Sequence, residues 1–187
     1  MNGKWNILIS IVLVSLSCEF VLAKPVEKFL GTIQCTNSIA DLRSGSFKLA
    51  IGDVRLKSGK GCVKLSPNDS NCEWTVELKR VEKWGSMPKF LLVVLNANHE
   101  RGSGSWDSVL MYVCQGRRFV PVFAERYLYG AKIEVDSTPS FSLRVGEWLP
   151  NDPICCPSRE NKKYFVWSET QRQFVLRDSK VTVTEKP

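Results

Sequence analysis

The sequence contains very little histidine, and this scarcity limits the catalytic chemistry that it can support. His99 is the only histidine among the 187 residues. Because histidine is the commonest general acid or base, a hydrolytic triad here would need His99, with Asp107 as a nearby carboxylate. No Gly-x-Ser-x-Gly segment, the turn that presents the serine nucleophile in many hydrolases, accompanies them. The favoured interpretation of His99 is a surface-loop residue, so we assign no catalytic residue.

The sequence also lacks the clusters that bind metal ions and nucleic acids. It has no Cys-x-x-Cys pair, and His99 is far in sequence from the clustered cysteines, so no metal site is predicted. The net charge is +7, from 26 Lys and Arg against 19 Asp and Glu. However, acids separate the basic residues, as in residues 77–83, and this pattern is typical of a solvated surface. We therefore expect no nucleic-acid partner and no cofactor.

Long apolar runs are confined to the N-terminus. Lys4 precedes an apolar segment that opens with residues 5–14, and Val21-Leu22-Ala23 precedes Lys24. A positive start, a short apolar run and small or aliphatic residues at its end are the pattern of a secretory signal peptide. We therefore expect residues 1–23 to be removed and the mature protein to be secreted or periplasmic.

Two alternatives to a cleaved signal peptide exist. The first is a membrane anchor, but the apolar run is short for a bilayer span and Glu19 interrupts its far end. The second is a lipoprotein lipidated at Cys18, whose preceding residues Ser15-Leu16-Ser17 match the processing pattern poorly. Nothing later in the chain is apolar enough to span a membrane, so residues after the cleavage site are expected to form one soluble domain.

The mature chain has an even number of cysteines, which in an exported protein indicates disulfide bonds. They are Cys35, Cys62, Cys72, Cys114, Cys155 and Cys156. In one pattern, Cys62 pairs with Cys72 across a turn-rich loop, Cys155 pairs with Cys156, and Cys35 pairs with Cys114. In the competing pattern the two adjacent cysteines bond to distant partners. Because six cysteines permit fifteen pairings, the sequence leaves both patterns open.

Apolar residues recur at β-strand spacing, and no long segment shows helical periodicity. Alternation and short apolar runs predict strands over residues 47–51, 54–56, 74–79, 90–95, 109–114, 119–123, 132–135, 141–145, 163–167, 173–176 and 181–183. The run 90–95 is apolar throughout, which predicts a strand covered on both faces. Pro121 predicts an edge strand or a bulge. Short helical turns are expected at residues 26–30 and 38–42, the second capped by Ser38.

These elements predict the fold class. We expect an all-β, disulfide-stabilised single domain, built as a sandwich, a barrel or a propeller-like antiparallel sheet, with one or two short N-terminal helices. The domain is expected to span residues 24–178, and residues 179–187 to form a polar C-terminal tail. We find no internal repeat and no low-complexity segment.

The second half of the chain contains a distinctive series of motifs. They are Gly102-Ser103-Gly104-Ser105-Trp106, Pro121, Gly130-Ala131-Lys132-Ile133, Leu149-Pro150-Asn151-Asp152-Pro153-Ile154-Cys155-Cys156-Pro157-Ser158 and Tyr164. The series resembles a family of uncharacterised bacterial exported proteins with a Gly-Ser-Gly-Ser-Phe-like turn and a Gly-Pro-Asn-Asp-Pro-Met-Cys-Cys-Pro-Thr-like loop. The resemblance covers about residues 88–178, and the Cys-Cys loop is its specific part. It implies an exported protein but no particular activity.

Aromatic residues next to these motifs form the candidate binding surface. Trp106 adjoins the glycine-rich turn, Trp148 adjoins the Cys-Cys loop, and Asp152 lies within that loop. If exposed together, they provide a surface for an unknown protein or glycan ligand, although tryptophan is more commonly packed in a core. We therefore favour a non-catalytic binding or interaction module, of which an inhibitor of a hydrolase is one form. The alternative is an enzyme, either a hydrolase using His99 or a thiol-redox protein using Cys155 and Cys156.

Overall fold

The computed structural model describes residues 28–183, except residues 65, 67, 69, 87, 103, 137, 138, 154 and 155. Three expectations therefore lie outside the described residues: the signal peptide, the lipidation of Cys18 and the bond between Cys155 and Cys156. Within the described part of the chain, no helix is long and apolar enough to cross a membrane.

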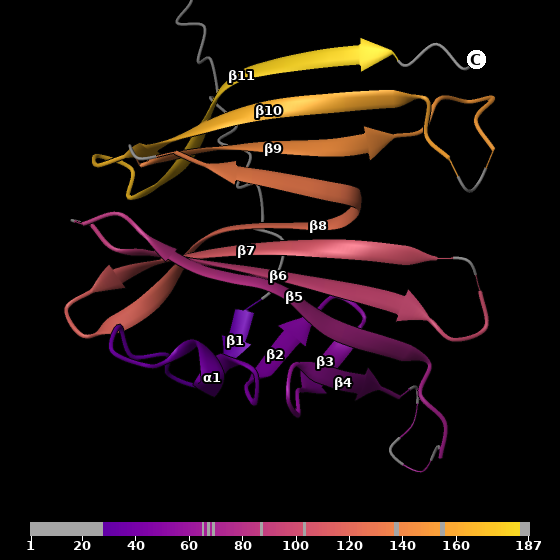
Figure 1. Ribbon diagram of the computed structural model, residues 1–187, viewed down its shortest axis with the longest axis horizontal. Helices are drawn as coiled ribbons and strands as arrows, with labels where there is room; N and C mark the ends of the chain where they lie inside the picture. The colour runs from indigo at the N-terminus through magenta and orange to yellow at the C-terminus, as the bar shows by residue number, and fades with distance from the viewer. Residues whose placement is uncertain are drawn as a thin grey trace, which may run out of the picture.

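Two antiparallel sheets make up most of the described chain (Figure 1). The smaller sheet has the order β1-β2-β3, with β1 at Lys28–Leu30, β2 at Ser46–Leu49 and β3 at Gly52–Arg55. The larger sheet runs β11-β10-β9-β8-β7-β6-β5-β4, so its neighbouring strands are consecutive in sequence. These are β4 (Lys60–Val63), β5 (Trp74–Trp84), β6 (Phe90–His99), β7 (Ser105–Gln115), β8 (Arg118–Val135), β9 (Ser140–Glu147), β10 (Arg159–Ser168) and β11 (Gln173–Val183). The prediction of an all-β antiparallel fold is confirmed.

Strand β8 joins the two halves of the larger sheet. Its residues 118–128 pair with β7, whereas residues 129–135 pair with β9. Between these parts, Tyr127 and Gly130 have φ angles of 57° and 58°, a region that glycine adopts freely and other residues adopt rarely. The strand bends there and carries the second half of the sheet back over the first (Figure 1). The sequence predicted two separate strands where the structure has one strand of 18 residues.

The folded sheet and the smaller sheet form three layers with a hydrophobic core in each of the two spaces between them (Figure 1). The first core lies beneath β5, β6 and β7 and includes Phe47 and Leu42 from the N-terminal layer. The second core lies between the two halves of the larger sheet and includes Phe141 and Phe165. This arrangement is the sandwich form of the predicted fold, with one additional layer.

Strand β6 contributes side chains to both cores. Leu91, Val93 and Leu95 belong to the first core, whereas Phe90 and Leu92 belong to the second. All five are at most 1% exposed. Successive side chains of a strand point to opposite faces, so a strand between two cores must be apolar at every position. The prediction that residues 90–95 are covered on both faces is confirmed.

Several local predictions can be compared with the structure. The helical turn expected at residues 26–30 is wrong for residues 28–30, which form β1 and pair with β2. The turn at residues 38–42 is confirmed as α1 (Ile39–Leu42). Strand β11 continues to Val183, so part of the expected polar tail pairs with β10. Pro121 lies at a register shift between β7 and β8, so the predicted bulge is confirmed.

The capping of α1 follows from its first residues. The Ser38 hydroxyl accepts a hydrogen bond from the backbone N–H of Asp41 at 3.3 Å. In return, the Asp41 carboxylate accepts one from the backbone N–H of Ser38 at 2.8 Å. This reciprocal pair satisfies two donors that the helix leaves without internal partners. The hydrogen bond from the Ser38 backbone, helped by one from the Asn37 amide, holds the pKa of Asp41 below its usual range.

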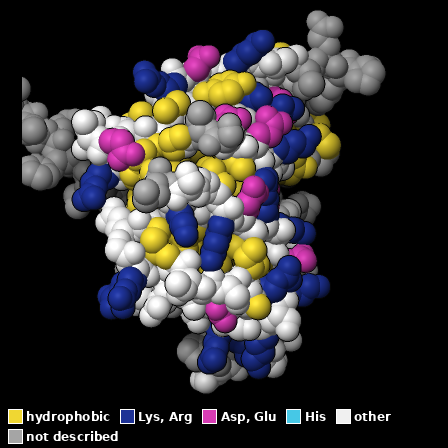
Figure 2. All heavy atoms as spheres, turned by 60° about the vertical axis from the view of Figure 1, so that its left-hand side comes forward, with side chains coloured by type: hydrophobic (Ala, Val, Ile, Leu, Met, Phe, Trp, Pro, Cys, Tyr) yellow, Lys and Arg dark blue, Asp and Glu magenta, His cyan; other side chains and the backbone are white. Residues whose placement is uncertain are grey.

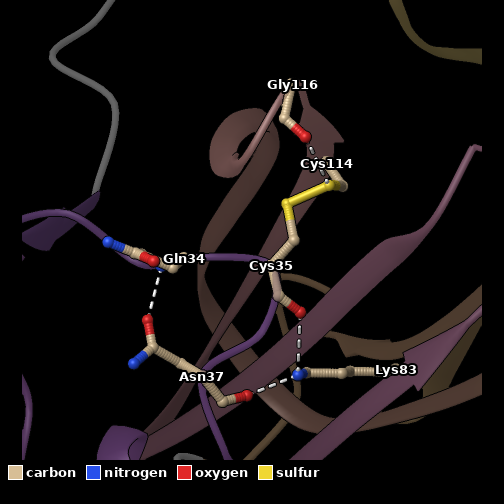
Figure 3. The surroundings of a disulfide bond; sticks show 6 residues. All are labelled: Gln34, Cys35, Asn37, Lys83, Cys114 and Gly116. Carbon is tan, nitrogen blue, oxygen red and sulfur yellow. Dashed lines mark hydrogen bonds between the residues drawn. A yellow bond between two sulfur atoms is a disulfide. The ribbon is translucent and has the colours of Figure 1, made fainter.

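Two disulfide bonds stabilise the N-terminal half, Cys35–Cys114 and Cys62–Cys72. Both pairs belong to the first of the two pairing patterns considered from the sequence. Figure 3 shows that Cys35–Cys114 attaches the segment before α1 to the end of β7. The ammonium group of Lys83 on β5 strengthens this attachment by donating to the carbonyl oxygens of Cys35 (3.3 Å) and Asn37 (2.5 Å). Such bonds form in oxidising surroundings, which indicates an extracytoplasmic compartment.

Candidate functional site

Four aromatic side chains that belong to neither core meet near the bend of β8. Trp106 comes from β7, Tyr127 and Tyr129 come from β8, and Trp148 follows β9. Their ring centroids are separated by 4.8 Å (Tyr129 and Trp148), 5.9 Å (Trp148 and Trp106) and 6.3 Å (Trp106 and Tyr127). Tyr127 is 52% exposed, and the other three are half-buried. We call these four residues the aromatic cluster.

The cluster depends on the bend of β8. The sharp turn at Tyr127 and Gly130 brings this part of β8 next to the loop between β9 and β10 (Figure 1). Trp148 lies where that loop begins, and its indole N–H donates to the carbonyl oxygen of Pro153 at 3.2 Å. The structure thus brings together Trp106 and Trp148, the two tryptophans proposed from the sequence. It adds the two tyrosines, which the sequence analysis did not identify.

Asp152 holds the loop between β9 and β10 in shape. Its Oδ2 atom accepts hydrogen bonds from the backbone N–H groups of Leu149 (2.7 Å) and Ser158 (2.8 Å), and its Oδ1 atom accepts from the Ser158 hydroxyl. These three bonds close the loop across its base. Asp152 was one of the candidate binding-surface residues, and its carboxylate is used within the loop that positions Trp148.

An ion pair strengthens the stem of the same loop. Glu147 at the end of β9 lies opposite Arg159 at the start of β10, with an oxygen–nitrogen distance of 2.6 Å. Asn161 also donates to the Glu147 carboxylate at 2.8 Å. The hydrogen bond from Asn161, followed by that from Arg159, holds the pKa of Glu147 below its usual range. The stem therefore fixes where the chain enters and leaves the loop.

A cleft of about 600 Å³ adjoins the aromatic cluster, and Tyr129 belongs to both. The cleft lies on the face of β6 that carries the second core, just beyond Val94, where polar side chains replace apolar ones. Its lining residues are Lys79, Val94, Asn96, Asn98, Ser105, Asp107, Tyr129, Gly130 and Ala131. The cleft thus combines a polar floor with the backbone of the β8 bend as one wall.

Asn96 and Asp107 organise the floor of the cleft. Asn96 is only 8% exposed, and its amide nitrogen donates to Asp107 Oδ1 at 2.8 Å and to Ser105 Oγ at 3.0 Å. The side-chain Oδ1 atom of Asn96 accepts a hydrogen bond from the side-chain Nδ2 atom of Asn98 at 2.8 Å. Asp107 Oδ2 accepts from the backbone N–H of Ala131 at 2.9 Å. Asp107 therefore provides an acceptor for the backbone N–H of Ala131, close to the point where β8 stops pairing with β7 and begins to pair with β9.

We expect Asp107→Ala to lower the free energy of unfolding by about 1–3 kcal/mol, because the Ala131 N–H loses its acceptor and the Asn96 amide loses one of its acceptors. Urea denaturation measures this loss, and hydrogen exchange at Ala131 shows whether the bend opens locally. Asp53→Ala removes an exposed carboxylate from β3 and serves as the matched control. Equal stability of the two variants would show that Asp107 does not hold the bend.

His99 lies away from this cleft. It follows Asn98 on β6, so its side chain points to the opposite face of the strand. Its Nδ1 atom accepts from the backbone N–H of Arg101 at 3.2 Å, and its Nε2 atom lies 3.6 Å from Glu73 Oε1. Among the described residues, no hydroxyl is hydrogen-bonded to His99, and Asp107 bonds to other groups. The described residues therefore do not include the triad that the hydrolase alternative requires.

The described charged side chains include no metal-binding group and no single basic patch on the face shown in Figure 2. Among the residues that the structure describes, no group of three or more His, Cys, Asp or Glu side chains is placed to hold a metal ion. Figure 2 shows Lys and Arg spread over one face of the molecule among acidic and hydrophobic side chains. The positive net charge is therefore not concentrated in a single patch on this face.

No protein-family model, curated protein or solved structure matches this chain. The aromatic cluster and the cleft are therefore the basis for assigning a function.

Proposed function

We propose that the protein is an exported, non-catalytic binding module whose binding surface is the aromatic cluster together with the adjoining cleft. The observation that carries the proposal is the meeting of four aromatic rings, from three separate segments, outside both cores. Aromatic side chains at a surface contribute large contact areas for little loss of conformational freedom and dominate many binding interfaces. The N-terminal sequence pattern and the disulfide bonds support export.

Tyr127 supports a binding role more strongly than a structural one. Its ring remains 52% exposed, so burial contributes little to keeping it there. Its φ of 57° is a conformation that costs a non-glycine residue roughly 1–2 kcal/mol. Backbone strain of this kind is often found at ligand-binding sites, where the surrounding structure maintains it. A large exposed ring on a strained residue is therefore best explained by a contact with a ligand.

The chemistry of the cleft also favours binding over catalysis. Asp107, the one carboxylate among the described lining residues, accepts hydrogen bonds from two donors with both of its oxygens. Lys79 pairs with Glu77 at 3.0 Å. The hydrogen bonds from Asn96 and Ala131 fix the position of Asp107, which suits recognition of a ligand. The alternative redox enzyme depends on Cys155, which lies outside the described residues.

We expect small fragments to bind at this surface. The test is a nuclear magnetic resonance titration of the ¹⁵N-labelled protein with a fragment library containing monosaccharides, amino acids, aromatic acids and phosphate. Amide shifts should concentrate at Asn98, Trp106, Trp148 and residues 127–131. Trp106→Ala should abolish these shifts, whereas Tyr164→Ala, which removes a 39% exposed ring from β10 outside the cluster, should leave them unchanged.

Two outcomes of this titration would refute the proposal. Shifts concentrated on another surface, such as the exposed strand β11, would place the binding site elsewhere. No shifts with any fragment would show that the aromatic cluster does not bind small ligands.

A further inference from the structure

We infer that the ligand of this surface is a neutral oligosaccharide, an inference that rests on the proposed function and specifies its ligand class. Three features carry it: the charge balance of the cleft, the hydrogen-bonding groups on its floor, and the series of aromatic rings that continues from it. Each agrees with the chemistry of a sugar chain, which presents many hydroxyl groups and an apolar C–H face on most of its rings.

Among the described residues that line the cleft, one side chain is basic and one is acidic, and each contacts a polar partner. Lys79 Nζ lies 3.0 Å from Glu77 Oε2, and Asp107 accepts from Asn96 and from Ala131. Binding of an anionic ligand commonly uses cations that form charge-assisted hydrogen bonds with it, as Arg and Lys do in phosphate sites. Among the described residues that line the cleft, Lys79 is the one cation, and it is shared with Glu77. The nearby Arg126 guanidinium lies 5.7 Å from the centre of the Tyr127 ring at the far end of the aromatic cluster. The cleft itself therefore favours a ligand without net charge.

The floor of the cleft presents groups that both donate and accept hydrogen bonds. A side-chain amide offers two N–H donors and two acceptor positions, and a hydroxyl offers both functions. Asn98 is exposed and uses one N–H to bond to Asn96, which is itself fixed by Asp107 and Ser105. The Asn98 amide is therefore held in one orientation before a ligand arrives. Sugar hydroxyls, which donate and accept at the same atom, match such an amide well.

The aromatic cluster extends the site beyond a single sugar ring. Tyr129 lines the cleft, Trp148 contacts Tyr129, Trp106 contacts Trp148, and Tyr127 contacts Trp106. Adjacent rings are inclined by 56–87°, so the cluster presents both faces and edges. An aromatic face is an apolar surface with a negative quadrupole, against which the C–H face of a sugar packs favourably. A series of rings next to a polar cleft is therefore suited to several linked sugars.

The shape of the site favours a small, chain-like ligand over a folded protein. Its concave part has a volume of about 600 Å³, which lies in the range of small-molecule pockets. Its lining places two amides, a hydroxyl and a carboxylate among apolar surface that includes Val94 and Ala131. A protein interface instead needs a wide contact area with a desolvated apolar centre.

The inference can be tested by titration calorimetry of the purified protein with cellohexaose, chitohexaose, xylohexaose and mannohexaose, beside the acidic hexagalacturonate and a heparin hexasaccharide. We expect at least one neutral hexasaccharide to bind with an affinity that salt does not change. Asn98→Ala should weaken binding about tenfold, the effect of losing roughly 1.4 kcal/mol of interaction. Tyr127→Ala should weaken it further, and Tyr164→Ala should have no effect. Asn98, Tyr127 and Tyr164 are exposed, so their removal should leave the fold intact.

The alternative outcomes separate this inference from the proposed function. If fragments bind at the aromatic cluster but no neutral hexasaccharide binds, the binding module stands and the ligand class is wrong. Preferential binding of the acidic hexasaccharides, weakened by salt, would likewise overturn the neutral class. If a hexasaccharide binds equally to wild type and Asn98→Ala, the cleft is not its site. If neither fragments nor oligosaccharides bind, the inference and the proposed function both fail.

Discussion

Phe141→Ala is expected to lower the free energy of unfolding by about 3–5 kcal/mol, the range for truncating a fully buried phenylalanine. Phe141 on β9 is 0% exposed. Its ring centroid lies 5.1 Å from that of Phe123 on β8, 4.8 Å from Phe165 on β10 and 4.9 Å from Phe174 on β11. The substitution therefore removes contacts with three other strands at once and leaves a cavity between the two halves of the larger sheet.

Urea denaturation of the wild type and the variant measures this loss. Phe141→Leu provides the matched control, because it keeps most of the apolar volume and should cost less than about 1.5 kcal/mol. Hydrogen exchange can locate the damage, which should be greatest in β9, β10 and β11. If Phe141→Ala and Phe141→Leu were equally stable, the second core would not be closely packed around this ring.

Removal of the Cys35–Cys114 bond by a Cys35→Ala and Cys114→Ala double substitution should cost about 4–5 kcal/mol. The bond closes a chain segment with a sequence separation of 79, and the loss of entropy that a cross-link imposes on the unfolded chain grows with loop length. The Cys62–Cys72 bond closes a separation of only 10, so its removal should cost about 3 kcal/mol. A domain of ordinary stability has about 5–15 kcal/mol in total, so the first loss brings it close to unfolding.

The comparison between the two double variants tests this expectation. Both remove a pair of half-buried cysteines, so the loss of side-chain packing is similar and the difference reports mainly loop length. Urea denaturation under oxidising conditions, with the four-alanine variant as a further reference, gives the two free energies. A greater loss from the Cys62 and Cys72 variant would show that local structure, and not loop closure, determines the contribution of these bonds.

The strands that were predicted most accurately are those whose surroundings leave a clear sequence pattern. Residues 90–95 are apolar at every position because β6 lies between two cores. The Cys62–Cys72 bond could be considered from the sequence because a short, turn-rich loop separates the two cysteines. In contrast, most of the end of β11 was assigned to a polar tail, with a strand predicted only at residues 181–183, because this edge strand is exposed and largely polar.

The candidate site was predicted only in part. Trp106 and Trp148 were chosen because they adjoin distinctive motifs, and they do lie together. Tyr127, Tyr129 and Asn98 were missed because their proximity depends on the bend of β8 and on the register of β6 with β7. One signal was present: the alternation that places Phe90, Leu92 and Val94 on the second core continues to Asn96 and Asn98. A core face that turns polar along the same strand indicates a cleft.

The strictly consecutive order of β4 to β11 has a consequence for how the molecule folds. Each strand pairs with the one made just before it, so the larger sheet can grow by adding one hairpin at a time. Such short-range pairing lowers the contact order, which favours fast folding for a β protein. The Cys35–Cys114 bond is different, because its two cysteines are separated by 79 positions in the sequence. This bond is therefore a long-range link added to a sheet of short-range pairings, and a chain kept reduced should be easier to unfold.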